Sequence, residues 1–517
     1  MSQRAVFHLA EELGITVTPD AFRAAFPERR SSSFVLDGGG ATAHPRLDRA
    51  AFMGAAPSAT FRARRSGAKD AAGRALANVV VDHVGGRRIE RRDVDPFTAL
   101  RDLLSTCSLG ADAFDPRYPF SFRAGLVGYL GYECGQTLER LPGIPRRTVG
   151  MPDMAFALHD WVIATSRDRG QSWLSVLGAG ETRADARREA EAIRDRIVGV
   201  LRSRSSVQVP ERPPIEPRIV ADLSSTEYME RVRSAKEHIA AGDAFEICMT
   251  TAMRTPFADE LAGPLFDELR RANPAPFAAL LDLPEGTIVS SSPERFLSLD
   301  ARGIAESRPI KGTRPRGATP EEDARLARDL ATSEKDRAEN AMIVDLVRND
   351  LGRVCRFGTV EVPELYAVEP YATVHQLVST VRGELSEGRD AIDLLRACFP
   401  PGSMTGAPKI EAMRIIEELE PAERGVYSGA LGWIDRGGAM DLSVVIRTAV
   451  VTDDTATFSV GGAVVADSDP RAEHEEAEHK ASALVRAIET VSSPPRTVSP
   501  PRHQPHGQAP SGHTLET

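Results

Sequence analysis

Lys311 is the one lysine in the segment 307–317, which also carries three arginines. An amine attacks carbon only in its unprotonated form, and an ordinary lysine, with a pKa of about 10.4, is almost fully protonated at pH 7. Neighbouring cations and removal from water would lower that pKa. Lys311 is therefore a candidate nucleophile, although an exposed basic loop is the commoner explanation of such a run.

Two predicted helices each carry a carboxylate at the head of an apolar stripe. In residues 470–491, Glu476 and Lys480 share one face with apolar side chains, and in 334–351 Glu339 leads a similar stripe. A charge in such a position is costly unless it is paired. Glu339 and Glu476 could share Mg²⁺, which prefers oxygen ligands. A surface salt bridge from Glu476 to Lys480, or two ordinary acidic faces, would explain the same spacing.

Two glycine-rich stretches could supply backbone N–H groups to an anion. Residues 402–409 precede a predicted helix, and the N-terminus of a helix favours a negative charge. Gly461, Gly462 and Ala463 end a strand-like run, where small residues let a carboxylate approach the backbone closely. Ordinary turns would also account for both stretches.

Three further segments predict the elements that surround these residues. Residues 182–201 and 224–242 carry apolar side chains at helical spacing. In 439–451, apolar and polar residues alternate, which predicts one strand with Arg447 on the face opposite to the apolar side chains. Helices and runs of strands are segregated along the chain, so we expect an α+β fold.

Two polar stretches divide the chain. Residues 203–218 are rich in proline, arginine and serine and predict a linker, and 491–517 have the composition of a disordered tail. The predicted ordered blocks are therefore 1–202 and 219–490. The first block holds no catalytic constellation, so we expect the second to carry the chemistry.

Composition excludes several classes of protein. With 41% hydrophobic residues in a chain of 517, a substantial core can form. The formal net charge of −10 argues against general binding to nucleic acid or to an anionic membrane. Five scattered cysteines indicate neither a disulfide framework nor a zinc site. Without a signal region or a run of about 18 apolar residues, we expect a cytoplasmic protein.

Eight motifs follow one another in order along the second block. They are SPERF (292–296), PIKGTRPRG (309–317), ENAMIVDLVRNDLGRV (339–354), ATVHQLVSTV (372–381), GSMTGAPK (402–409), YSGALGW (427–433), VVIRTAV (444–450) and EHEEAEHKA (473–481). This order resembles the chorismate-utilising enzymes, which include anthranilate synthase component I, aminodeoxychorismate synthase component I, isochorismate synthase and salicylate synthase. The resemblance implies their chorismate-binding fold, with antiparallel β-sheets in a layered sandwich flanked by helices.

The resemblance implies catalytic roles for three residues. Glu294 would act as the general acid on the departing C4 hydroxyl of chorismate, and Lys311 would add at C2 to give a covalent intermediate. Ammonia would then attack C4 and displace the lysine, which leaves 4-amino-4-deoxychorismate. His375 is expected close to the substrate, with a purely structural or orienting histidine as the alternative.

The resemblance also implies a metal site and a binding site for the substrate. Glu339 and Glu476 would hold Mg²⁺ against the ring carboxylate of chorismate. The residues expected to bind the substrate are Gly312, Thr313, Tyr427, Arg447, Gly461, Gly462, Ala463 and Lys480.

Lys311 separates two branches of these enzymes. Anthranilate synthases resemble PIAGT in the PI-x-GT motif, and aminodeoxychorismate synthases resemble PIKGT, as here. Isochorismate and salicylate synthases place a lysine near Glu246, where this chain has none. The resemblance favours aminodeoxychorismate synthase component I, which serves p-aminobenzoate synthesis. The alternatives are anthranilate synthase component I or another chorismate-utilising enzyme, and a non-catalytic chorismate-binding relative.

The source of ammonia has to be considered separately. No cysteine lies in the G-x-C-x-G context of a glutamine amidotransferase. The resemblance therefore implies a separate glutamine amidotransferase subunit as partner, or free ammonia as the substrate.

Overall fold

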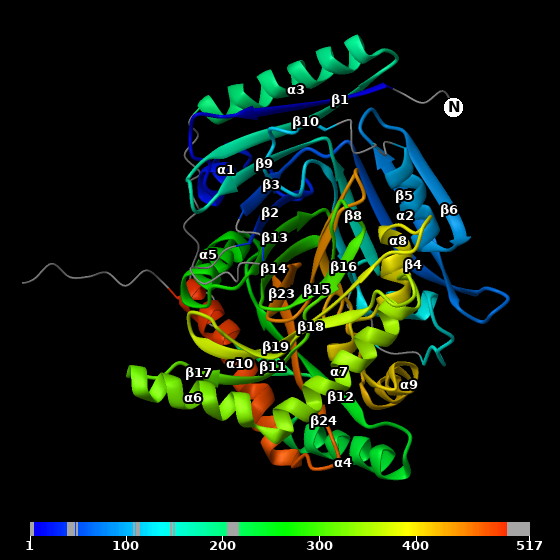
Figure 1. Ribbon diagram of the computed structural model, residues 1–517, viewed down its shortest axis with the longest axis vertical. Coiled ribbons are helices and arrows are strands. Elements are labelled where there is room, and N and C mark those ends of the chain that lie inside the picture. Colours follow the sequence, from blue (N-terminus) through cyan, green and yellow to red (C-terminus); the bar gives the residue numbers. More distant parts are fainter. Residues whose placement is uncertain are drawn as a thin grey trace, which may run out of the picture.

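Two large antiparallel sheets form the body of the molecule (Figure 1). The computed structural model describes residues 5–38, 47, 50–106, 109, 114–144, 147, 150–203 and 217–493. Most of the predicted linker 203–218 and nearly all of the predicted tail 491–517 lie outside these residues.

The first sheet has 12 strands. In spatial order they are β1 (Ala5–Glu12), β10 (Ser172–Gly180), β9 (Trp161–Ser166), β3 (Ala50–Gly54), β2 (Ser33–Asp37), β13 (Phe277–Leu283), β14 (Gly286–Ser292), β23 (Thr448–Thr452), β24 (Thr455–Val464), β12 (Glu246–Pro256) and β11 (Val220–Ala221), with β20 (Gly406–Ala407) paired to β12.

The second sheet also has 12 strands. Their order is β17 (Ile310–Pro315), β19 (Val374–Glu384), β16 (Ile304–Ser307), β15 (Arg295–Leu299), β22 (Met440–Val444), β21 (Ala430–Asp435), β7 (Gly125–Leu130), β8 (Met154–His159), β4 (Ala59–Lys69), β5 (Ala75–His83) and β6 (Arg88–Val94), with β18 (Glu361–Pro370) paired to β19.

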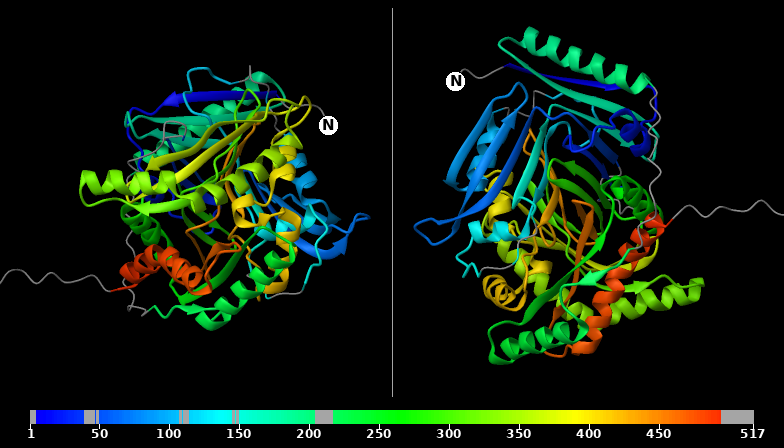
Figure 2. Two further views of the ribbon diagram at one scale, coloured as in Figure 1. Left: turned by 60° about the horizontal axis from the view of Figure 1, so that its bottom comes forward. Right: turned by 180° about the vertical axis from the view of Figure 1, so that it is seen from behind.

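Helices cover the outer faces and ends of the sheets. They are α1 (Pro19–Ala25), α2 (Pro96–Ser105), α3 (Arg183–Arg202), α4 (Ser225–Ala241), α5 (Ala262–Ala272), α6 (Pro320–Thr332), α7 (Glu334–Gly352), α8 (Ala391–Cys398), α9 (Lys409–Leu419) and α10 (Pro470–Ser492). Figure 1 shows α3 lying over β1 and β10, and Figure 2 shows α10 running between α5 and α4.

The two helices expected at 182–201 and 224–242 are confirmed as α3 and α4. Thr182 and Ser224 cap them with capping boxes, in which the side chain of the cap and the acidic residue three positions later satisfy each other's backbone N–H groups. Gly242 ends α4 at φ 87°, a left-handed conformation that glycine adopts without strain.

Aromatic side chains fill the space between the sheets. Phe122 stacks on Trp433 of the second sheet with ring centroids 4.8 Å apart, and Phe52 of the first sheet meets the same indole edge-on at 6.2 Å. All three side chains are buried, and burial of such surface is worth about 25 cal/mol per Å². The α+β fold and the layered sandwich flanked by helices are therefore confirmed.

The single strand expected at 439–451 is wrong. The structure has two strands there, β22 in the second sheet and β23 in the first, with Arg447 between them at a φ of 53°. Apolar residues continue through the crossing because both sheets bury them. The alternation predicts extended chain but cannot reveal that the hydrogen-bonding partner changes.

Strands from both predicted blocks build each sheet. β2 pairs with β13 in the first sheet, and β7 pairs with β21 in the second. The boundary at 203–218 stays a prediction about the sequence, while the segments on its two sides share their sheets and their core.

Cysteines and helices give two further observations. Cys134, Cys248, Cys355 and Cys398 are free and buried. In the part of the chain that the structure describes, no helix is both long and apolar enough to cross a membrane.

Candidate active site

A cavity of about 840 Å³ opens between the two sheets and the helices α7 and α10. It brings together 12 of the residues singled out in the sequence: Glu294, Lys311, Gly312, Thr313, Glu339, Tyr427, Arg447, Gly461, Gly462, Ala463, Glu476 and Lys480. Residues far apart in the sequence thus share one space, although their individual roles stay predictions.

Lys311 lies on β17 where the pairing with β19 changes register. Its Nζ donates to Oε1 of Glu246 at 2.6 Å, and the Glu246 side chain is fully buried. Burial lowers the pKa of Lys311, but the negative charges of Glu246 and Glu339 outweigh it and raise that pKa well above its ordinary value. The resting amine is therefore a cation.

The arginines around Lys311 do not lower its pKa, contrary to the expectation from the sequence. Arg308 pairs with Glu369, Arg314 with Asp329 and Asp336, and Arg316 with Asp323. Each guanidinium is thus paired with its own carboxylate on a neighbouring element.

Glu294 follows β14 and is buried. Burial raises its pKa to about 7, against a lowering by the Ser403 hydroxyl, by the charge of Lys311 and by the backbone N–H of Ile310. A carboxyl group with this pKa is close to half protonated at neutral pH, so it can donate a proton there. This protonation state suits the general acid expected from the sequence.

The carboxylates of α7 and α10 face the cavity without full neutralisation. Burial raises the pKa of Glu339, and Glu246 adds to this effect although Lys311 opposes it. Burial also raises the pKa of Glu473, with a contribution from Glu476. Lys335 is 3.8 Å from Glu339, and Lys480 is 2.7 Å from Glu476. The salt bridge expected as an alternative is therefore present.

The donor set of Glu339 and Glu476 fits Mg²⁺. Both lie on separate helices and line the same cavity, and the pKa of Glu339 is raised by burial and by the charge of Glu246, effects that a bound cation would offset. Among the described residues, no group of three or more His, Cys, Asp and Glu could hold a metal ion. Two carboxylates with waters and substrate oxygens are what Mg²⁺ commonly takes.

Arg447 offers a positive charge without a carboxylate partner. Its pKa is lowered by burial, and it forms no ion pair within the described part of the chain. Because a desolvated guanidinium is costly unless an anion meets it, Arg447 is poised for a carboxylate of a ligand. The phenol of Tyr427 lines the same wall, and burial raises its pKa.

Glycines in β24 allow β12 and α10 to come close. A Cβ at Gly461 would lie 2.0 Å from the carbonyl oxygen of Met249, and one at Gly462 would lie 2.7 Å from Oε2 of Glu473. Lys480 donates to the carbonyl of Gly461 at 2.9 Å. Packing against the backbone of β12 therefore requires glycine at 461, whatever it binds, while at Gly462 only the end of the Glu473 side chain would have to move.

His375 does not line the cavity, so the structure corrects its expected place beside the substrate. Its neighbours Val374 and Gln376 line the cavity. Successive residues of a strand point to opposite faces, which sends His375 to the outer face, where Nε2 lies 2.9 Å from Oδ1 of Asp323. The orienting or structural alternative matches this contact.

Gln376 and Glu246 are two polar residues that sequence reasoning missed as parts of the site. Gln376 is buried at the cavity wall, and within the described ranges of the chain its Oε1 has no hydrogen-bond partner. Side chains alternate between the two faces of the strand along 372–381. Gln376 could therefore have been assigned to the cavity face once Val374 was known to lie there. No local pattern could have indicated Glu246, because 65 positions separate it from Lys311.

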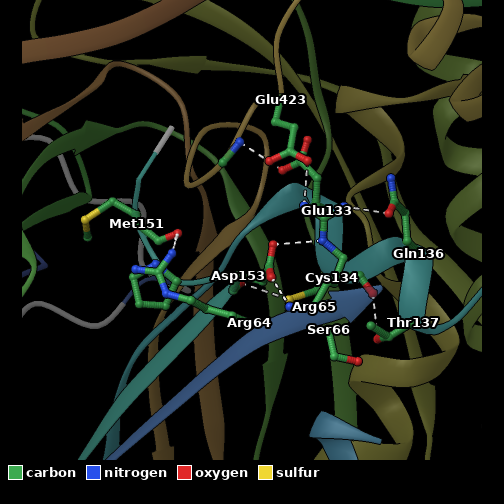
Figure 3. Close-up of polar contacts among 12 residues, drawn as sticks. Arg64, Arg65, Ser66, Glu133, Cys134, Gln136, Thr137, Met151, Asp153 and Glu423 are labelled. Carbon is green, nitrogen blue, oxygen red and sulfur yellow. Dashed lines mark hydrogen bonds and ion pairs between the residues drawn. The ribbon is translucent and has the colours of Figure 1, made fainter. Parts of the chain in front are cut away.

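A polar network holds the chain segment that leads to Tyr427 (Figure 3). Arg65 of β4 donates to Asp153 at 3.0 Å and to Glu423 at 2.7 Å. Glu133 accepts from the backbone N–H groups of Arg424 and Gly425, both at 2.9 Å.

Arg424 extends this network to the cavity. Its guanidinium donates to the carbonyl oxygens of Cys248 and Met404, which both line the cavity. The first block of the sequence thus fixes the cavity wall through buried hydrogen bonds.

Comparison with known proteins shows which family the chain belongs to. The chorismate binding enzyme family matches residues 70–486. Aminodeoxychorismate synthase of Streptomyces pristinaespiralis is 42% identical over 491 residues, which are 93% of this chain and 65% of that protein. The chain thus spans less than two thirds of this relative.

Two shorter relatives match over more of their length. Aminodeoxychorismate synthase component 1 of Salmonella typhimurium is 40% identical over 72% of this chain and 78% of its own. The crystal structure of anthranilate synthase component I from Streptococcus pneumoniae superposes with a TM-score of 0.69 at 26% identity, and covers 92% of this chain and 99% of that one. From its motifs, its fold and these matches, the chain belongs to the family of chorismate binding enzymes.

Proposed function

We propose that this chain aminates chorismate and releases 4-amino-4-deoxychorismate, as the chorismate-converting component of an aminodeoxychorismate synthase. One observation carries the proposal: the amine of Lys311 lines the same cavity as the buried acid Glu294. Relatives named for this activity, with 42% and 40% identity, support it.

The substrate is a dianion, and the cavity offers matching cations and dipoles. Arg447 lacks an ion-pair partner among the described residues and would bind one carboxylate, with Tyr427 beside it. The other carboxylate of the substrate would lie beside Lys480 and the backbone of Gly461, Gly462 and Ala463. Gly312 and Thr313 continue the wall next to Lys311. Local positive charge explains how a chain of net charge −10 would admit such a ligand.

Glu339 and Glu476 would hold Mg²⁺ in this proposal. The ion would neutralise the ring carboxylate and so draw electron density from the ring. Both side chains line the cavity, and the pKa of Glu339 is raised by burial first and then by the charge of Glu246, both of which a bound cation would offset.

The protein's own groups divide the reaction between them. Glu294 donates its proton to the C4 hydroxyl, which leaves as water while the Lys311 amine bonds to C2. Ammonia then bonds to C4, the lysine leaves C2, and Glu294 takes a proton from the new ammonium group. Each group returns to its starting state, and the net change is replacement of the hydroxyl by an amino group.

Ammonia would come from a separate glutamine amidotransferase subunit or from solution. No cysteine of this chain has the sequence context of an amidotransferase nucleophile. A cytoplasmic location of both components belongs to the same proposal.

Formation of anthranilate is the second candidate function. The structural likeness to an anthranilate synthase component I at 26% identity favours it. Lys311, at the position where those enzymes resemble PIAGT, speaks against it.

Product analysis separates the two candidates. Purified protein is incubated with chorismate, MgCl₂ and ammonium, with and without an added aminodeoxychorismate lyase. We expect p-aminobenzoate only with the lyase. Fluorescent anthranilate in amounts that match chorismate consumption, formed without the lyase, would overturn the proposal.

A further inference from the structure

We propose that Glu246 positions the amine of Lys311 and takes up its proton before the amine attacks the substrate. This inference rests on the proposed function, and it adds a residue that touches neither substrate nor metal but acts through Lys311. The chemistry it would serve is proton transfer between Lys311 and Glu246. Lys311 lines the cavity, and Glu246 lies outside the lining.

Glu246 is the first residue of β12, and its side chain is fully buried. Its Oε1 is 2.6 Å from Nζ of Lys311, which is within the range of a strong charge-assisted hydrogen bond. Its Oε2 is buried and has no hydrogen-bond partner among the residues that the structure describes. Lys311 lines the cavity and Glu246 does not, so Glu246 stands directly behind the amine.

A carboxylate in this position is hard to explain by stability alone. Leaving a buried acceptor without a partner costs about 1–3 kcal/mol, and native structures contain few such groups. An uncharged pair of the same shape would avoid this cost.

Lys311 needs such an acceptor because its amine is charged at rest. A proton acceptor must lie within hydrogen-bond reach, and among the described residues Lys311 forms an ion pair with Glu246 alone. Four other titratable groups interact with Lys311 through charge alone. They are Glu339 on α7, Glu476 on α10, Cys248 on β12 and Glu294 after β14.

Contact with Glu246 also fixes where the amine lies. A lysine side chain has a flexible four-carbon stem, and holding it in one place costs conformational entropy. Gly312, next in the chain, has φ 83° and lies where a Cβ would be 2.7 Å from Asp336. The backbone is thus tightly placed, and the pair with Glu246 extends this placement to Nζ.

The proton cycle balances. The ammonium of Lys311 passes one proton to Oε1 of Glu246, and the neutral amine forms the N–C2 bond as the C4–O bond breaks. The adduct nitrogen then carries the positive charge. When ammonia has bonded to C4, the lysine leaves C2 as a neutral amine and recovers its proton from Glu246. No oxidant or further reactant is needed.

Glu246→Gln tests the inference, because it keeps the shape and removes the proton acceptor. The rate of adduct formation on Lys311 is measured by rapid quenching and mass spectrometry, with chorismate and MgCl₂, from neutral to alkaline pH. We expect the rate at neutral pH to fall about 100-fold. We also expect the rate to rise by up to about tenfold per pH unit. Glu339 still raises the pKa of Lys311 in this variant, and the ammonium must then lose its proton to solvent. The KM for chorismate should change little.

Glu417→Gln is the matched control. Glu417 is a buried glutamate on α9 that accepts from Gln136 at 2.6 Å and from the N–H of Gly143 at 2.9 Å, away from the cavity. We expect its rate and pH profile to stay within about twofold of those of the unmodified protein. Glu246→Asp, which keeps an acceptor on a shorter stem, should recover part of the loss.

The outcomes distinguish this inference from the proposed function. A wild-type rate and pH profile in Glu246→Gln would overturn the role of Glu246 while leaving the amination intact. Failure of the unmodified protein to convert chorismate would overturn the proposed function itself. If Glu246→Gln does not fold, Glu246→Asp decides: a slower adduct with a steeper alkaline rise supports the inference, and an unchanged profile contradicts it.

Discussion

At the scale of single residues, the cavity is organised by which buried groups carry protons. Lys311 is held as a cation by Glu246 and Glu339, and Glu294 is held close to half protonated by burial. Lys311 therefore starts protonated, as an exposed lysine does, although a nucleophile has to be unprotonated. Glu294 starts close to half protonated, whereas an exposed glutamate would be ionised. For the proposed reaction, Lys311 has to lose its proton and Glu294 has to hold one when the substrate is bound.

The pKa of Glu294 predicts a dependence of stability on pH. Its folded-state pKa of about 7 lies above the ordinary 4.5, so the folded protein holds this proton more tightly than the unfolded chain. This contribution is fully present below about pH 4.5 and is lost as the pH rises through about 7. The free energy of unfolding, relative to Glu294→Gln, should therefore fall by up to about 3 kcal/mol over this range.

Urea denaturation at several pH values, without substrate or Mg²⁺, measures this difference. A difference between the two proteins that stays constant from pH 4.5 to 8 would mean that Glu294 is not protonated in the folded protein.

Glu339→Gln should weaken the response to Mg²⁺. Removal of one of two carboxylate ligands should raise the MgCl₂ concentration for half-maximal activity at least about tenfold, since even indirect substitutions cost that much. Asp345→Asn makes the same change at an exposed position of α7 and serves as the control. Equal MgCl₂ responses of the two variants would contradict the metal assignment.

At the scale of elements, close contact between β24, β12 and α10 shapes one wall of the cavity. The carbonyl of Met249 occupies the space that a side chain at Gly461 would need. Sequence alone could only treat this glycine pair as a possible anion cradle. The packing shows a second reason for glycine at position 461.

Gly461→Ala should therefore destabilise the protein by about 1–3 kcal/mol, because the added methyl group forces β24 away from β12. Gly199→Ala lies in the exposed part of α3, where a Cβ meets nothing within 4 Å, and should stabilise by up to about 1 kcal/mol. Denaturant unfolding of both variants checks this. A Gly461→Ala protein as stable as the parent would show that the strands can separate without cost.

The elements that sequence predicts best are those with local signals. Thr182 and Ser224 mark helix starts through short-range hydrogen bonds, so α3 and α4 could be located within a residue or so. The segment 439–451 has no such signal where the chain passes from the second sheet to the first. Apolar side chains are buried in both sheets, so the alternation of residue types continues through this point. His375 was misplaced for a related reason, since a one-residue shift along a strand exchanges its faces.

At the scale of the whole molecule, the two predicted blocks share both sheets. β2 and β13 are hydrogen-bonded neighbours, as are β7 and β21. The cavity wall near Tyr427 depends on hydrogen bonds from Arg65 and Glu133 of the first block. Such long-range contacts are specified by three-dimensional packing. Composition could therefore suggest a boundary between the blocks, but it could not reveal that both blocks contribute strands to each sheet.

Cleavage of the chain between the blocks should leave them associated. A protease site placed within 203–218 and cut after purification should give two fragments that elute together in gel filtration and unfold in one transition. The shared strand pairs and buried core provide the reason. Separation of the fragments in native buffer would contradict a common core.

The site as a set was predictable because its motifs occur in a fixed order, and motif order does not require knowledge of distances. Glu294, Lys311, Glu339 and Glu476 all reach the cavity. The pairing of the Lys311 ammonium with a buried carboxylate was not predictable, because Glu246 lies 65 positions away in the sequence.

The most direct measurement is the mass of the peptide that carries Lys311 after brief incubation of the protein with chorismate and MgCl₂ in the absence of ammonia. We predict that this peptide gains the mass of one chorismate less one water, and that Lys311→Ala shows no such gain at any site. An unmodified Lys311 peptide at every quench time, in a preparation that aminates chorismate at full rate once ammonium is added, would contradict attack by this amine.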